Sequence, residues 1–348
     1  MWEQNRYTKK EIDRAGKDIF DKDITPEQKE KSIQIIDAFR AAHAFPMNTF
    51  AINLKKKVSK IPSAVVVQRL KRIDTIIYKL QRYPNMKLSR MQDLGGCRVI
   101  VPKIEDVYSI VKEIRDSRIR HIEHNYKDYI AIPNPKTGYR GYHLIYKYNS
   151  DRNNRYNGLQ IEVQIRTKLQ HLWATAVETV GLFTDNGLKF NSGSSEWIEF
   201  FKLTSALFSL KENSAVVEGV PIIEEDLYKR WFYLERKLDA ITMLSAIGIA
   251  AYKKGHIRTK KSNRKKEGYY LIKLNLDNIS VKIEEFENAK EATNAYNIFE
   301  KEKSSSMIDG VLVSAKSYET LVDAYPNYFF DIREFLKEIQ DIFDNYKK

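Results

Sequence analysis

The segment GLQIEVQIRT, at residues 158–167, limits the possible folds strongly because apolar and polar side chains alternate along it. A period of two is typical of a β-strand with one buried face. Its apolar positions are Leu159, Ile161, Val163 and Ile165. The next residues change to a helical period, with an apolar stripe of Leu169, Leu172, Trp173, Ala176, Val177 and Val180. A strand that continues into an amphipathic helix predicts a sheet with a helix packed on it.

The polar face of this predicted strand carries Glu162, Gln164 and Arg166. Three consecutive polar positions on one face of a strand need either water or a ligand on that side. The segment alone is consistent with two interpretations, which are an edge strand with a solvated face and a strand that lines a binding site.

Other segments predict a mixture of helices and strands. We expect one or two helices within residues 1–57, one helix over 65–83, a strand at 97–101, a helix at 106–114, a strand at 142–148 and a long helix from Leu227 towards Gly248. This mixture predicts an α/β or α+β class.

The chain of 348 residues has a formal net charge of +13, which favours a polyanionic substrate or partner. The charge is unevenly distributed, since residues 269–348 contain 10 Lys and Arg against 15 Asp and Glu. The basic run at residues 256–268 is interpreted as a linker, with a nucleic-acid contact as the alternative. We therefore divide the chain into residues 1–255, the linker 256–268 and a C-terminal domain at 269–348.

Cysteine content and hydropathy indicate the compartment. The single cysteine, Cys97, excludes an internal disulfide and fits a reducing environment. The most apolar stretch, residues 240–252, has 13 residues and is too short to cross a bilayer. We expect a cytoplasmic protein with no membrane partner.

Two further segments put charged and aromatic residues beside glycines. RMQDLGGCRVIV contains Asp93 and Arg98, and KDYIAIPNPKTGYRGYH contains Lys127, Tyr139 and His143. In a loop rich in Gly and Pro, an exposed Tyr139 would offer a flat face to a nucleobase.

The carboxylates of Asp93 and Glu162 are candidates for a magnesium site. Hard cations bind carboxylate oxygens and leave positions for phosphate. The neighbouring Arg and Lys side chains would then neutralise phosphate charge as it shifts during transfer.

Five segments between about residues 60 and 180 resemble, in the same order, the motifs of the synthetase domain of the RelA/SpoT family. The matching positions are Arg69, Lys71, Thr75 and Lys79; Asp93 and Arg98; Lys127, Asp128 and Tyr129; Gly138, Tyr139 and His143; and Glu162, Gln164, Ile165, Arg166 and Thr167. The resemblance implies an α+β fold of nucleotidyltransferase type, in which helices flank a mixed β-sheet. It also implies transfer of the β,γ-pyrophosphate of ATP to a nucleotide 3′-hydroxyl.

The resemblance assigns a role to each matching residue. It implies that Arg69 and Arg98 sandwich the adenine of ATP. Residues that would bind the ATP phosphates are Lys71, Thr75, Lys79 and Lys127. Asp93 and Glu162 would be the catalytic and Mg²⁺-binding pair, and Glu162 would also accept the proton of the acceptor hydroxyl. Residues that would bind the acceptor are Tyr139, His143, Gln164 and Arg166.

Residues 269–348 resemble the C-terminal pseudo-zinc-finger domain of the CapRel family, whose members are fused toxin–antitoxin proteins of phage defence. In that family the toxin half resembles a small alarmone synthetase and pyrophosphorylates the 3′ end of tRNA, which blocks translation. The tail restrains the toxin through a YxxY motif, which would correspond to Tyr325 and Tyr328. Because the chain has 21 tyrosines, two half-buried aromatics at a turn are the alternative interpretation.

Together the resemblances imply an ATP-dependent pyrophosphokinase that modifies tRNA, uses Mg²⁺ and is autoinhibited by its C-terminal domain. A phage protein such as the major capsid protein would release it, and a monomer is the simplest expectation. Two alternatives stay open, namely a (p)ppGpp or (p)ppApp alarmone synthetase and a non-catalytic regulator that binds RNA or nucleotide.

Overall fold

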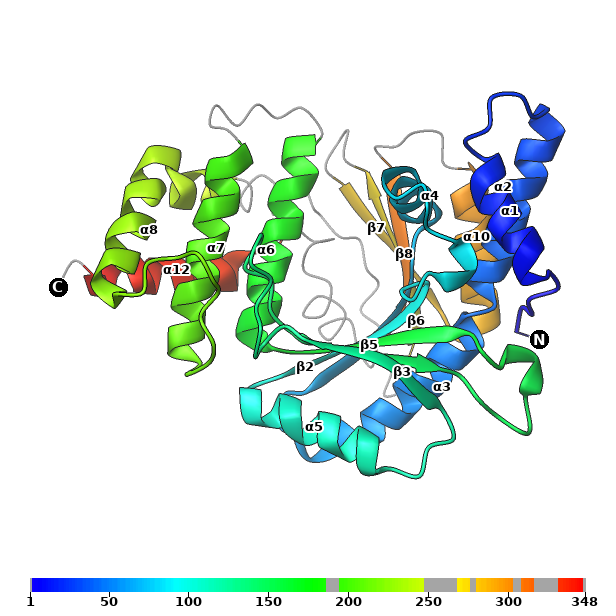
Figure 1. The fold of residues 1–348 in the computed structure, drawn as a ribbon, viewed down its shortest axis with the longest axis horizontal. Coiled ribbons are helices and arrows are strands. Elements are labelled where there is room, and N and C mark those ends of the chain that lie inside the picture. Colours follow the sequence, from blue (N-terminus) through cyan, green and yellow to red (C-terminus); the bar gives the residue numbers. More distant parts are fainter. Residues whose placement is uncertain are drawn as a thin grey trace.

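A computed structural model of the chain describes residues 2–185, 194–246, 268–275, 280–302, 308–315 and 331–346. Its centre is an eight-stranded sheet with the order β3-β4-β5-β2-β1-β8-β6-β7 (Figure 1). The strands are β1 Val65–Leu70, β2 Gly95–Val101, β3 Ile122–Asp128, β4 Tyr142–Lys147, β5 Gln160–Thr167, β6 Gly268–Asn275, β7 Ser280–Phe286 and β8 Ile308–Ala315. Strands β2 and β5 are parallel, and the other neighbouring pairs are antiparallel. The predicted α+β fold with a mixed sheet flanked by helices is confirmed.

Helices cover both faces of this sheet (Figure 1). Helices α3 Ala44–Lys57 and α5 Ile104–Asp116 lie on one face, and α4 Ile73–Arg82 and α6 Lys168–Asp185 lie on the other. Further helices are α1 Lys9–Asp18, α2 Pro26–Ala41, α7 Ser194–Lys211, α8 Glu224–Leu238, α10 Ala289–Glu302 and α12 Arg333–Tyr346. Among the residues that the structure describes, no helix has both the length and the apolar composition needed to cross a membrane.

The N-terminal region forms three helices, where the sequence predicted one or two. Helices α1 and α2 each begin with a capping box, in which a threonine and the third helical residue exchange hydrogen bonds. The pairs are Thr8 with Glu11 and Thr25 with Gln28. These caps satisfy amide groups that have no partner within the helix and fix where each helix begins.

Residues 65–83 do not form the single helix that their spacing predicted. Val65–Leu70 is strand β1, and the helix begins only at Ile73. Three consecutive valines favour extended backbone, and β1 lies inside the sheet between β2 and β8. The three valines place apolar side chains on both faces at the start of the strand, which conceals the period of two.

The helix predicted from Leu227 towards Gly248 is interrupted. Helix α8 ends at Leu238, and Asp239 has a left-handed backbone with φ of 46°. Aspartate tolerates this conformation better than most residues. Residues 240–246 are helical again, whereas Gly248 lies outside the described residues.

The described parts of the C-terminal region contact the rest of the chain through a strand pairing, a helix packing and a contact of Tyr296 of α10 with Arg40 of α2. Strand β8 pairs with β1, where Val313 lies opposite Arg69. Helix α12 packs into an apolar core with α6, α7 and α8, and its Phe335 and Ile339 are fully buried. A separate core lies between the sheet and helices α1 to α5. The predicted Tyr325–Tyr328 motif, and the linker except for Gly268, lie outside the described residues.

Candidate active site

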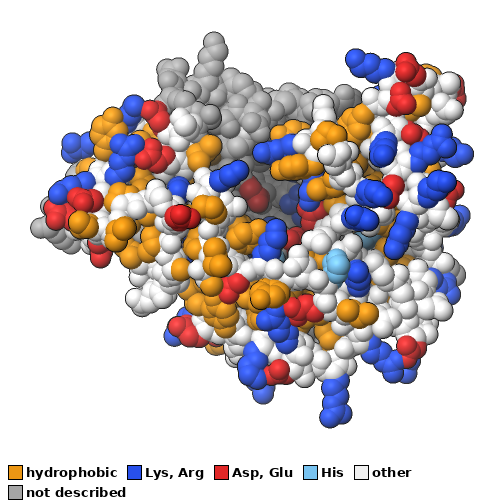
Figure 2. Space-filling model, viewed as in Figure 1, with side chains coloured by type: hydrophobic (Ala, Val, Ile, Leu, Met, Phe, Trp, Pro, Cys, Tyr) orange, Lys and Arg blue, Asp and Glu red, His pale blue; other side chains and the backbone are white. Residues whose placement is uncertain are grey.

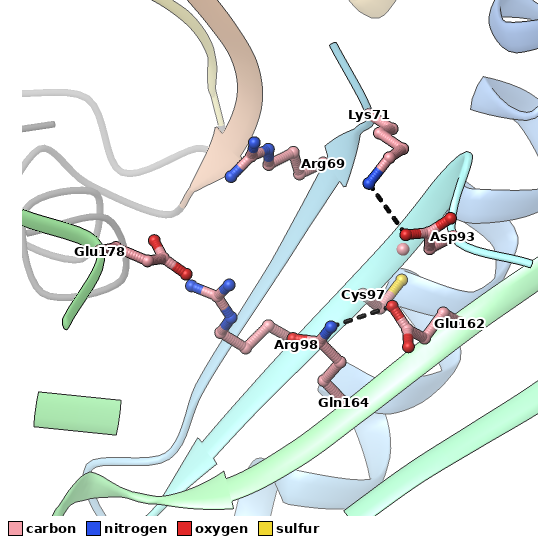
Figure 3. Close-up of a pocket in the computed structure, with 9 residues that line it drawn as sticks. Arg69, Lys71, Asp93, Cys97, Arg98, Glu162, Gln164 and Glu178 are labelled. Atoms are coloured by element: carbon pink, nitrogen blue, oxygen red, sulfur yellow. Dashed lines mark hydrogen bonds and ion pairs between the residues drawn. The ribbon is translucent and has the colours of Figure 1, made fainter. Parts of the chain in front are cut away.

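A cavity of about 220 Å³ lies on the face of the sheet that α4 and α6 cover (Figure 3). Its lining consists of Arg69, Lys71, Asp93, Gly96, Cys97, Arg98, Glu162, Gln164 and Glu178. Six of these nine residues were predicted from the sequence to belong to one nucleotide and magnesium site. Figure 2 shows the same region as a hollow between α4 and α6 with Lys and Arg side chains along its rim.

Strand register brings the predicted residues together. Gly96 of β2 lies between Arg69 of β1 on one side and Glu162 of β5 on the other. Arg98 lies opposite Gln164 in the parallel pair of β2 and β5. Because side chains two residues apart share one face of a strand, three neighbouring strands point into the same cavity. Strand β5 is an interior strand, so the alternative of a solvated edge strand is wrong.

Asp93 is bound by two lysines. Its Oδ2 lies 2.9 Å from the Nζ of Lys71, and its Oδ1 lies 2.9 Å from the Nζ of Lys79. Burial alone would raise the pKa of the Asp93 carboxyl, but the charges of Lys71 and Lys79 outweigh burial and hold the pKa below its usual value. Burial lowers the pKa of Lys71 despite the charge of Asp93. The two lysines and one carboxylate therefore form a compact, net positive group.

Glu162 is held by a chain of hydrogen bonds. Its Oε1 lies 2.9 Å from Nδ1 of His143, and its Oε2 accepts a hydrogen bond of 2.9 Å from Nε2 of Gln164. The Tyr139 hydroxyl lies 2.7 Å from Nε2 of His143, and Arg166 donates to Oε1 of Gln164 at 2.7 Å. Burial raises the pKa of Glu162, but the hydrogen bond and charge of His143 help to hold the pKa below its usual value. At neutral pH the carboxylate is therefore ionised and fixed in direction.

The expectation of an exposed Tyr139 is wrong. Its side chain is half-buried and packs against the second apolar core. The ring centroid lies 5.6 Å from the guanidinium carbon of Arg166 and 5.5 Å from the ring of Tyr129. Gly138 allows this close packing, because its φ is +80° and a Cβ there would lie 3.1 Å from Cα of Lys202.

Three of the predicted phosphate-binding residues lie outside the cavity lining. Lys79 still reaches the site through Asp93. Thr75 is half-buried and lies one turn before Lys79 on α4, so that both belong to the same helix face. Lys127 is exposed on β3 opposite His143, and its Nζ lies 5.8 Å from the centroid of the Tyr129 ring.

The carboxylates of Asp93 and Glu162 fit a magnesium ion. Mg²⁺ is commonly bound by one or two carboxylates together with substrate phosphates. The charge of Asp93 raises the pKa of Glu162, as expected for two carboxylates that share one cavity. No group of three or more His, Cys, Asp or Glu side chains in the described ranges would hold a metal alone. A cation at Asp93 would also have to replace the ammonium groups of Lys71 and Lys79.

Sequence reasoning missed Glu178, which lines the cavity from α6. Glu178 lies directly after Val177 of the apolar stripe. The stripe predicts how this helix packs but does not predict a role for its polar side. The available signal was a carboxylate on the helix that follows the functional strand.

The part of the chain that forms the cavity is similar to known proteins. Residues 68–181 match the family model described as the region found in RelA and SpoT proteins. The match includes the cavity lining from β1 to α6 and ends before the C-terminal strands.

Two curated relatives that match about a third of this chain come from Bacillus subtilis. The GTP pyrophosphokinase YjbM is 33% identical over 116 residues, which is 33% of this chain and 54% of the relative. The GTP pyrophosphokinase YwaC is 35% identical over 116 residues, which is 31% of this chain and 52% of the relative. The chain thus spans about half the length of these relatives.

Solved structures with similarity to the chain include two small alarmone synthetases from Bacillus subtilis. Synthetase 2 covers 54% of this chain and 95% of its own, with 23% identity and a TM-score of 0.42. Synthetase 1, bound to its product pppGpp, covers 48% of this chain and 90% of its own, with 25% identity and a TM-score of 0.40.

Proposed function

We propose that this protein is a Mg²⁺-dependent pyrophosphokinase that transfers the β,γ-pyrophosphate of ATP to a nucleotide hydroxyl. The observation that carries the proposal is that Asp93 and Glu162 line one cavity together with Arg69, Lys71 and Arg98. Two carboxylates would repel a phosphate ligand, so a module that only binds nucleotide gains nothing from both. This argues against a non-catalytic regulator. The sequence identity of 33% and 35% to two GTP pyrophosphokinases supports pyrophosphate transfer as the reaction class.

Each residue of the site would have a separate role in the reaction. Lys71 and Lys79 would bind the phosphates, since ammonium groups form strong charge-assisted hydrogen bonds to phosphate oxygens. Glu162 would accept the proton of the acceptor hydroxyl, whose oxygen forms a bond to the β-phosphorus of ATP. The bond from that phosphorus to the oxygen bridging the α-phosphate breaks, and AMP leaves with that oxygen. When bound at Asp93 and Glu162, Mg²⁺ would neutralise phosphate charge.

We propose the 3′ end of tRNA as the acceptor. The net charge of +13 and the basic rim of the hollow in Figure 2 support a large polyanionic substrate. A guanosine nucleotide is the second candidate, because both relatives from Bacillus subtilis are named GTP pyrophosphokinases.

We further propose that the C-terminal region restrains this activity in the cytoplasm until a phage protein, such as a major capsid protein, binds it. The pairing of β8 with β1 at Arg69 supports the proposal, because it brings the C-terminal region beside the cavity. A tyrosine of the Tyr325–Tyr328 motif would stack on Arg69 or Arg98 in place of adenine. Tail and nucleotide would then compete for one position.

Incubation with ATP labelled at the γ-phosphate tests the activity and the acceptor together. The protein is supplied with Mg²⁺ and with tRNA, GDP or no acceptor, in the presence and absence of a candidate phage protein. Label on tRNA supports the proposal, and label on a guanosine nucleotide supports the second candidate. If neither the parent with the candidate phage protein nor the Tyr328→Ala variant labels any acceptor, the chain is not a pyrophosphokinase of this kind.

A further inference from the structure

A carboxylate outside the cavity lining connects two segments of the candidate active site. Glu212 directly follows α7, and its side chain is only 11% exposed. Its Oε2 accepts hydrogen bonds of 3.1 Å from Nη1 of Arg140 and of 3.1 Å from Nε2 of Gln170, and its Oε1 accepts one from the hydroxyl of Thr167. Glu212 lies beyond the matched residues 68–181, and the proposed reaction assigns it no role.

Two of these three donors lie directly beside residues of the site. Arg140 follows Tyr139, whose hydroxyl lies 2.7 Å from Nε2 of His143. Thr167 is the last residue of β5, the strand that carries Glu162. One side chain that does not line the cavity therefore joins the loop before β4 to the end of β5.

Helix α7 holds the same loop, residues 129–141, at a second point. Oγ of Ser205 donates a hydrogen bond of 2.6 Å to the carbonyl oxygen of Gly138. Nη2 of Arg140 also donates to the hydroxyl of Ser214, three residues after the end of α7. The loop is therefore attached to α7 and the residues that follow it, in addition to its own strands β3 and β4.

A carboxylate suits all of the contacts that Glu212 makes. Arg140, Gln170 and Thr167 all act as donors, and an ionised carboxylate offers only acceptors. The Arg140 side chain is 3% exposed, so its charge needs compensation inside the protein. Without Glu212 the guanidinium would turn towards water and would displace the neighbouring Tyr139.

We propose that Glu212 is a positioning residue for the acceptor side of the site. It holds loop 129–141 against the end of β5 and so fixes the direction in which His143 and Glu162 face the acceptor hydroxyl. A misplacement of about 1 Å caused by a distant mutation can lower a rate about a hundredfold. This inference rests on the proposed function and adds to its acceptor side a residue from outside the matched region.

The donor side should depend little on Glu212. Lys71 and Lys79, which would bind the ATP phosphates, are held by Asp93. Loss of Glu212 should therefore impair the steps that involve the acceptor and leave the affinity for the donor unchanged. A general loss of folding would impair both.

Two substitutions remove different parts of the contacts of Glu212. Glu212→Ala removes all of them and should lower kcat/KM for the acceptor about tenfold to a hundredfold, the usual effect of losing a residue that orients a catalytic group. In Glu212→Gln the amide oxygen can still accept from Arg140 and Gln170, and the amide nitrogen can donate to Thr167, so the loss should be about threefold to tenfold. Glu218→Gln, the same change at an exposed loop residue outside the cavity lining, is the matched control and should keep the parent values.

Three measurements on the full chain separate positioning from folding. Transfer of γ-label to tRNA and to GDP is measured with the proposed restraint released, either by the candidate phage protein or by Tyr328→Ala. Calorimetry with α,β-methylene ATP, which cannot transfer its pyrophosphate, gives the donor dissociation constant, which should stay within about threefold of the parent value. Trypsin cleavage after Lys136, an exposed residue of the loop, should be faster in Glu212→Ala because the loop opens more often.

The outcomes separate this role from the proposed function. If both Glu212 variants transfer label as the control does, the positioning role is refuted and the proposed function is unaffected. If acceptor and donor parameters worsen together with the melting temperature, Glu212 only supports the fold and the inference is refuted. If Glu212→Ala does not fold, Glu212→Gln decides by the same criteria. If trypsin cleaves faster after Lys136 but no chain labels an acceptor, the hold on the loop stands, while the proposed reaction and with it the acceptor role are refuted.

Discussion

Nδ1 of His143 lies 2.9 Å from Oε1 of Glu162, and the two residues lie on neighbouring strands, β4 and β5. The histidine is held in turn by the hydroxyl of Tyr139 at its other ring nitrogen. A polar chain therefore connects the packed loop around Tyr139 with the carboxylate that lines the cavity. Within this account His143 orients Glu162.

The His143→Ala variant should lower transfer about tenfold to a hundredfold, which is the usual effect of removing a partner that orients a metal-binding or catalytic group. Donor KM should change less than kcat, because His143 does not line the donor cavity. Tyr139→Phe removes only the hydroxyl and should cause a smaller loss. Initial rates with labelled ATP measure both effects, and an unchanged rate in His143→Ala would show that this contact has no role.

Stability should decrease as the pH falls below about 6.5, because His43 is buried in its neutral form. Its side chain is 1% exposed, its Nδ1 lies 2.8 Å from the carbonyl oxygen of Phe39, and burial lowers its pKa to about 4. The unfolded chain binds a proton at a higher pH than the folded chain does, so the stabilisation present above pH 6.5 is lost between pH 6.5 and 4. The loss should be about 2 to 3 kcal/mol.

Denaturant unfolding at several pH values measures this loss. His43→Asn is the matched variant, since its amide can donate to Phe39 and does not titrate between pH 4 and 7. The difference between parent and variant isolates His43 from the carboxylates that also titrate in acid. If the free energy of unfolding changes with pH in the same way for the parent and His43→Asn, the loss of stability does not come from His43.

Removal of the Tyr296 ring should destabilise the contact between the N-terminal and C-terminal regions. Arg40 of α2 and Tyr296 of α10 are both fully buried, and the guanidinium carbon lies 4.8 Å from the ring centroid. Tyr296→Ala should cost about 3 to 5 kcal/mol through the cavity and the lost contact with the cation. Tyr296→Phe keeps the ring and should stay within about 1 to 2 kcal/mol of the parent. Thermal unfolding and limited proteolysis measure the stability of Tyr296→Ala and Tyr296→Phe. Equal stability of these variants would show that the contact between the Tyr296 ring and Arg40 does not stabilise the fold.

The proposed restraint by the C-terminal region predicts that Tyr328→Ala makes expression more toxic in the absence of phage. Tyr126→Ala is a suitable control, because Tyr126 and Tyr129 have the same spacing as the proposed motif and Tyr126 is exposed on β3. Growth after induction is the measurement. A Tyr328→Ala strain that grows as well as the parent would exclude this tyrosine as the restraint.

The sequence predicted those parts of the site whose pattern is local. Strand β5 alternates cleanly because its polar side faces the cavity, and its register beside β2 brings Glu162 next to Gly96. Strand β1 was mistaken for helix, because its three initial valines hide the alternation and its extended form is fixed by β2 and β8. Tyr139 was expected to be exposed, because its contact with the second core depends on helices that follow much later in the chain.

The central claim is that Asp93 and Glu162 act as one site on ATP, and transfer of γ-label to an acceptor tests it most directly. Transfer is measured in the presence of Mg²⁺ and again in the presence of EDTA for the parent, Glu162→Gln and Asp93→Asn. Glu218→Gln serves as the control. All chains are assayed with the proposed restraint released, either by the candidate phage protein or by Tyr328→Ala. We then predict label transfer by the parent and the control with Mg²⁺, none with EDTA, and a loss of at least about a thousandfold in both site variants, since each removes a charge required in the transition state. Both variants should keep the circular dichroism of the parent. Transfer by folded Glu162→Gln or Asp93→Asn within threefold of the parent would contradict the account.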